Sequence, residues 1–178
     1  MKKTTNTYVS FTAASLMILS YGMATPALAA GVQDTAAAYS EGGRYFTKDD
    51  IPTFNIGEDG TVDWPTYEGF RRYHSECHVC HGPEGEGSSY APALKKSVMN
   101  MDYYDFLEIV AGGKEESKGG TEFVMPSFGT NKNVMCYIDD IYVYLRARGA
   151  DAVPRGRPRK KEPKSDEIRQ AQKDCLDG

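Results

Sequence analysis

Apolar residues recur at helical spacing in three separate stretches of the chain, and each stretch predicts a helix. The first covers residues 63–77, where Asp63 is a candidate N-cap and Pro65 falls in the first turn, so its missing N–H does no harm. The second covers about residues 100–111 and stops at a pair of glycines. The third covers about residues 131–148. This pattern predicts an all-α fold.

The segments around these helices lack helical periodicity. Residues 30–62 are rich in Ala, Gly and Asp, and we interpret them as an extension that covers the domain, with a small hairpin near 54–62. Residues 114–121 are typical of a polar loop. After the third helix, the proline- and basic-rich residues 153–164 predict a linker, and Ser165 can then cap a short helix.

The N-terminal end has the pattern of a secretory signal. Lys2 and Lys3 supply the charge, residues 9–23 are apolar, and residues 27–29 offer a small-x-small cleavage site. The apolar run is short and diluted by Ser and Thr, so we expect an exported mature chain without a membrane span. The predicted parts of the chain are a signal peptide (1–29), an N-terminal extension (30–62), one domain (63–149) and a basic linker with a C-terminal tail (150–178).

The charge of the predicted mature chain is negative and uneven. Without residues 1–29 the chain has 19 basic and 25 acidic residues, a formal charge of −6. Residues 31–150 carry 11 basic and 19 acidic side chains, whereas residues 151–178 carry 8 and 6. An acidic body excludes nucleic acid as an expected partner. It suits either attraction to a basic protein surface or ordinary solubility.

The main candidate for chemistry is Cys77-His78-Val79-Cys80-His81. Two thiols at this spacing can form thioether bonds to one haem, and the histidine that follows can bind the iron as proximal ligand. A structural zinc would need two more close ligands. A thioredoxin-like pair would follow a buried strand, whereas this one ends a helical pattern. One motif therefore predicts one covalent haem c, held by Cys77, Cys80 and His81.

Methionine is the best candidate for the sixth ligand of the iron. The only other histidines, His74 and His78, flank the attachment motif on its own side. Met125 is favoured because Pro126 restricts the backbone before it, and Met101 comes next; lysine or open coordination stay possible. On the proximal side, a turn about ten residues after His81 can supply the carbonyl that orients its ring.

With these residues assembled, the sequence resembles a class I cytochrome c, in which three main helices surround one covalently bound haem. The resemblance covers roughly residues 64–149, and it implies that Pro92 belongs to the turn that orients His81 and that Leu94 packs on the haem. It also implies that Gly69 lies where the first helix crosses the last. Met125-Pro126 matches the distal loop of that class.

Within this class the chain is more closely similar to four-cysteine cytochromes c of methanol metabolism in methylotrophic bacteria. The similarity lies in residues 63–70, the haem motif, residues 119–128 and the cysteines at 136 and 175. It implies a disulfide between Cys136 and Cys175, as an oxidising compartment allows.

The same similarity implies a function. We expect a periplasmic electron carrier rather than an enzyme, with a calcium- or lanthanide-dependent quinoprotein methanol or alcohol dehydrogenase as donor and another cytochrome c or an oxidase as acceptor. Two alternatives stay open: a fixed haem subunit through which electrons enter a larger oxidoreductase complex, and a ligand-binding or peroxidatic haem protein.

Overall fold

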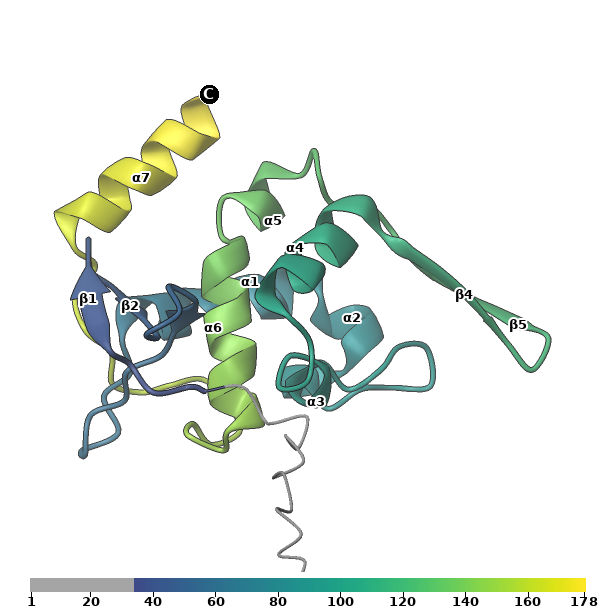
Figure 1. The fold of residues 1–178 in the computed structure, drawn as a ribbon, viewed down its shortest axis with the longest axis horizontal. Coiled ribbons are helices and arrows are strands. Elements are labelled where there is room, and N and C mark those ends of the chain that lie inside the picture. Colours follow the sequence, from purple (N-terminus) through teal and green to yellow (C-terminus); the bar gives the residue numbers. More distant parts are fainter. Residues whose placement is uncertain (1–33) are drawn as a thin grey trace, which may run out of the picture.

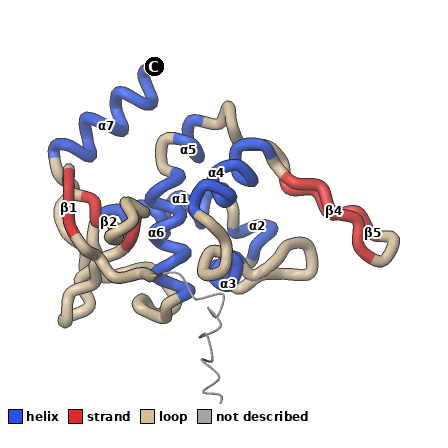
Figure 2. The backbone as a smooth tube through the Cα atoms, viewed as in Figure 1, coloured by secondary structure: helices blue, strands red, loops and turns tan. Residues whose placement is uncertain are grey.

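The computed structural model describes residues 34–178, so the predicted signal peptide, 1–29, lies outside the described residues. The described chain forms a helical body from which one β-hairpin projects (Figure 1). Figure 2 separates helices from strands along the same path. The helices are α1 (Trp64–Glu76), α2 (His78–His81), the 3-10 helix η1 (Pro83–Gly85), α3 (Leu94–Ser97), α4 (Tyr103–Gly112), α5 (Lys132–Met135), α6 (Ile138–Gly149) and α7 (Asp166–Asp177).

Helix α1 begins where the sequence predicts. The Asp63 carboxylate accepts hydrogen bonds from the backbone N–H of Thr66 at 2.7 Å and from that of Asn55 at 2.6 Å. Burial raises the pKa of Asp63 to about 6, and these bonds oppose the shift. The cap therefore satisfies the first turn of α1 and also holds the preceding extension in place.

Helices α1 and α6 cross with their backbones almost in contact. A Cβ atom added at Gly69 would lie 1.8 Å from the carbonyl oxygen of Asp140 and 2.7 Å from the Cβ of Tyr144. The main apolar core surrounds this crossing and includes the fully buried Tyr73 and Leu145. The crossing that the resemblance implied is therefore present, and glycine is required there because any side chain would push the helices apart.

The all-α expectation is wrong, because the described residues also form two small antiparallel sheets. One has the order β1 (Tyr39–Glu41), β2 (Arg44–Phe46) and β3 (Pro52–Thr53), and the other pairs β4 (Lys114–Lys118) with β5 (Thr121–Met125). The predicted hairpin near 54–62 is a single antiparallel bridge between Ile56 and Val62.

The segment predicted as a polar loop, 114–121, is instead most of the β4–β5 hairpin. Its five residue pairs run from Lys114–Met125 to Lys118–Thr121, and Gly119 and Gly120 form the turn with φ of +60° and +81°. The strand Lys114–Lys118 is exposed along its whole length. These strands satisfy each other's backbone groups without a buried face, so no alternation of apolar and polar residues marked them.

The predicted third helix, 131–148, is broken into α5 and α6. The break falls at Tyr137, whose backbone leaves the helical region at φ −132° and ψ 14°. The ring of Tyr137 is buried, and the guanidinium carbon of Arg72 lies 3.5 Å from its centroid. The apolar spacing continues across the break, so the sequence pattern could not reveal it.

The N-terminal extension and the C-terminal tail meet on α6. Asp140 is fully buried, and its carboxylate accepts from Nη1 of Arg44 at 2.5 Å and from Nε2 of Gln172 at 3.2 Å. The disulfide between Cys136 and Cys175 is present, as expected, and fastens α7 to the residue that caps the end of α5. Within residues 34–178, no helix has the length and apolar character needed to cross a membrane.

We predict that Gly69→Ala strongly destabilises the protein, by about 3 kcal/mol or more, because the two helices have no room to accept the methyl group. Urea denaturation followed by circular dichroism measures this change. The matched control is Gly112→Ala, a helical position with no atom within 4 Å of the added Cβ. That variant should be neutral or gain up to about 1 kcal/mol, and equal losses in both variants would contradict the close crossing.

Removing the disulfide should also lower stability. The bond joins residues 39 positions apart. In the chain-entropy model, replacing Cys136 and Cys175 together by Ser therefore costs about 4 kcal/mol. The measurement is the free energy of unfolding of the double variant against that of wild type. A thiol count that finds two free thiols in denatured, non-reduced wild type would contradict the bond.

Candidate haem site

The attachment motif forms its own short helix at the end of α1. Cys77 ends α1, and α2 carries His78 to His81. The backbone N–H of His81 donates to the carbonyl of Cys77 at 3.1 Å, so the turn is closed. Cys80 is exposed and Cys77 is partly buried, and burial raises the pKa of the Cys77 thiol to about 12. Both thiols are free of disulfides, and one turn of helix separates them.

The histidine of the motif is buried and held at one nitrogen. Only 6% of His81 is exposed, and its Nδ1 lies 3.0 Å from the carbonyl oxygen of Pro92. Burial lowers the pKa of His81, and the Pro92 carbonyl opposes that shift. A neutral ring that donates from Nδ1 leaves Nε2 available for a metal. This arrangement suits a proximal ligand.

The apolar side of the site comes from several elements. Cys77, Leu94, Met125 and Phe128 are partly buried and pack against the same core cluster. Cys77 of the motif, the expected haem contact Leu94 and the candidate sixth ligand Met125 therefore all border one apolar cluster. A porphyrin with two thioethers, one imidazole and an apolar wall fits these residues.

The β4–β5 hairpin delivers Met125. Met125 is the last residue of β5 and pairs with Lys114 at the base of the hairpin. The next residues return to α4, because the N–H of Phe128 donates to the carbonyl of Val110 at 3.0 Å and Ser127 Oγ donates to that of Ala111 at 2.5 Å. The segment that follows Met125 is thus held by β5 at its start and by α4 at its end.

The sequence did not reveal two further features of the site. The sequence predicts a loop where the hairpin that ends at Met125 lies, although the Gly119-Gly120 pair is a turn signal that favours a hairpin. Glu84 and Glu86, in the loop after His81, are paired with basic residues beyond residue 90. No local signal could have found those pairs, because their partners are distant in sequence.

The geometry defines a class of protein: a Cys-x-x-Cys-His helix whose buried histidine is oriented by a proline carbonyl is the site of a c-type haem protein. The chain matches no protein-family model.

Three known proteins are similar. The chain is 60% identical over 146 residues to cytochrome c-553I of Paracoccus denitrificans, an alignment that covers 82% of the chain and 65% of that protein. It is 40% identical over 96 residues to cytochrome c-555 of Methylococcus capsulatus, covering 53% of the chain and 72% of that protein. Among solved structures, the c-type cytochrome XoxG from Methylobacterium extorquens AM1 matches with a TM-score of 0.75 and 57% identity, over 80% of the chain and 87% of that structure.

The chain therefore belongs to the class I c-type cytochromes, in the family related to methanol metabolism, and it carries covalently bound haem c. Members of this class are electron carriers rather than enzymes.

Proposed function

We propose that the chain is a periplasmic monohaem electron carrier whose iron is bound by His81 and Met125 and whose haem is attached through Cys77 and Cys80. The observation that carries His81 as a ligand is the 3.0 Å contact between its Nδ1 and the Pro92 carbonyl, which leaves the other ring nitrogen available for a metal. Export through a cleaved signal, residues 1–29, gives the compartment in which the haem is attached.

The haem supplies one-electron transfer between ferrous and ferric iron, and the residues of the chain hold it for that purpose. His81 would bind the iron, with the Pro92 carbonyl orienting its ring. Met125 would be the second ligand from the protein, which would leave no open site for oxygen or peroxide. Leu94 and the core around it would keep water away from the haem. No acid, base or nucleophile is required.

The proposed electron donor is a quinoprotein methanol or alcohol dehydrogenase, and the proposed acceptor is another cytochrome c or an oxidase. Membership of the methanol-related family supports the donor. The charge of the body supports it as well, because residues 31–150 carry 19 acidic and 11 basic side chains and would be attracted to a basic docking surface.

Met125→Ala should abolish the weak far-red sulfur-to-iron absorption band of the ferric protein, because the thioether that produces it is removed. The optical spectrum of the purified holoprotein is the measurement. Met101→Ala is the matched control, since Met101 is also partly buried against the core and should leave the band intact. Loss of the band in the Met101 variant and its survival in the Met125 variant would assign the ligand to Met101.

The donor is tested by mixing the oxidised cytochrome with purified methanol dehydrogenases of the calcium and lanthanide types, each with substrate. We expect one of them to reduce the haem, with a rate that falls as salt is added, because charge attraction is screened. An artificial acceptor shows in parallel that each dehydrogenase is active. If active enzymes of both types leave the cytochrome oxidised, the proposed donor is wrong, whereas the haem site is unaffected.

A further inference from the structure

The loop directly after His81 has an unusual backbone. Glu84 has φ +58°, in the left-handed region that side chains other than glycine rarely adopt. Three glycines of the same loop, Gly82, Gly85 and Gly87, also have positive φ. Such a conformation persists only when the surrounding structure holds it. The contacts that hold this loop therefore bear on the histidine from which it starts.

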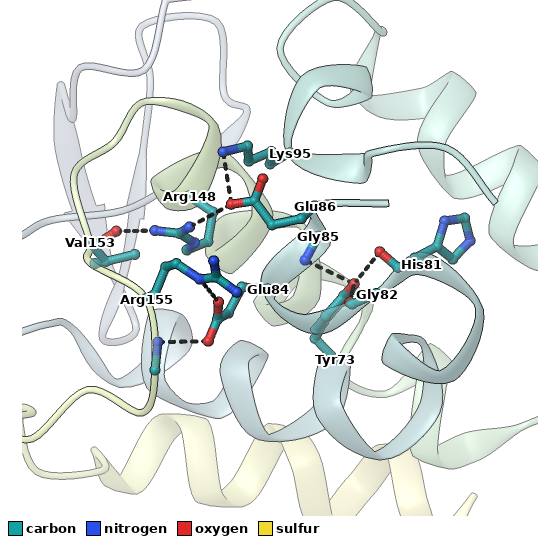
Figure 3. A network of polar contacts seen from close by, with 11 residues as sticks. Tyr73, His81, Gly82, Glu84, Gly85, Glu86, Lys95, Arg148, Val153 and Arg155 are labelled. Atoms are coloured by element: carbon teal, nitrogen blue, oxygen red, sulfur yellow. Dashed lines mark hydrogen bonds and ion pairs between the residues drawn. The ribbon is translucent and has the colours of Figure 1, made fainter. Parts of the chain in front are cut away.

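Tyr73 of α1 holds the inner side of the loop. Its hydroxyl donates to the carbonyl of Gly82 at 2.5 Å and accepts from the N–H of Gly85 at 2.9 Å (Figure 3). Tyr73 is fully buried. The N–H of Gly87 donates to the carbonyl of His81 at 2.8 Å and closes the loop on the histidine itself. A movement of the loop would therefore also shift the backbone of His81, to which the loop is hydrogen-bonded.

The segment after α6 holds the outer side of the loop. Nε of Arg155 donates to one carboxylate oxygen of Glu84 at 2.7 Å, and the backbone N–H of Gly156 donates to the other at 2.7 Å (Figure 3). Glu84 is only 8% exposed. Although burial raises the pKa of Glu84, these two donors bring it below its ordinary value. Glu84, the left-handed residue of the loop, is therefore held by one ion pair and one hydrogen bond from a backbone N–H.

A second acidic residue of the loop repeats this arrangement. The carboxylate of Glu86 accepts from Nζ of Lys95 at 2.9 Å and from Nη2 of Arg148 at 3.2 Å. Arg148 is 4% exposed and also donates to the carbonyl of Val153 at 2.5 Å. The same guanidinium thus joins the loop to the segment that follows α6, as Figure 3 shows.

We infer that residues 150–156 are a positioning segment for the haem histidine, and that the Glu84–Arg155 contact is its main anchor on the loop. Neither residue is placed to bind the iron; both act through the loop backbone, which leads to His81. The inference rests on the proposed role of His81 as ligand. It gives the part of the tail next to α6 a role in setting the reduction potential.

The rival reading is that Glu84 and Arg155 affect the haem only through their charges. The side chain of Arg155 is 66% exposed, and exposed ion pairs contribute little stability. The two interpretations predict different signs for the change in reduction potential of the variants. Removing a negative charge alone raises the reduction potential, and removing a positive charge alone lowers it. Loss of an anchor would instead loosen the loop that follows His81 and let water reach the haem in either variant, which would lower the potential in both.

The test compares Glu84→Gln, Arg155→Gln and the double variant as purified holoproteins. We expect the potential, measured by optical redox titration, to fall in all three. We also expect the amides of Gly85 and Gly87 to exchange with solvent about three to ten times faster, as the loss of one solvent-accessible hydrogen bond predicts. Arg155→Lys keeps the charge and should recover most of both properties. Arg159→Gln is the matched control, since the Arg159 side chain makes no hydrogen bond or ion pair with residues 34–178.

A rise in potential for Glu84→Gln with a fall for Arg155→Gln, and a double variant near wild type, would leave only the charge effect and overturn the inference. So would unchanged amide exchange in both single variants. The wild-type spectrum reports separately on the ligands: a wild type without histidine and methionine ligation contradicts the proposed site, whereas the amide exchange still reports on the network.

Discussion

The crossing of α1 and α6 at Gly69 is the contact on which the other parts of the molecule depend. It places α1, which ends where the haem motif begins, against α6. Helix α6 in turn contacts both the N-terminal extension and the C-terminal helix. Asp140 faces Gly69 at this crossing through its backbone and binds Arg44 and Gln172 through its side chain. One residue of α6 thus takes part in the crossing, the N-terminal sheet and the C-terminal helix.

The haem site is assembled from parts with different kinds of support. The motif sits on a helix turn continuous with the main core, and a single carbonyl orients its histidine. The proposed sixth ligand, Met125, ends an exposed hairpin whose strands gain little from burial. Met125 itself packs on the core. The two proposed ligands, His81 and Met125, therefore differ in how firmly the rest of the protein holds them.

Ionic contacts are concentrated where the loop after His81 meets the segment after α6. Glu84 and Arg148 are buried, so pairing with Arg155 and with the partly exposed Glu86 satisfies charges that would be costly to bury alone. The basic tail thus pairs with the acidic body of the same molecule, through Arg155 and Glu84. The uneven charge of the sequence has a structural use in addition to any effect on a partner.

The sequence by itself determined the features that depend on residues near one another. The Asp63 cap, the length of α1, the haem motif and the helix after Ser165 all follow from spacing and local chemistry. The tertiary structure decided what depends on distant residues: the break at Tyr137, the three-stranded sheet of the N-terminal extension and the pairing of Glu84 with Arg155. Periodicity records which face of an element is buried. It does not record which partner covers that face, and it is silent for strands such as β4 that bury none.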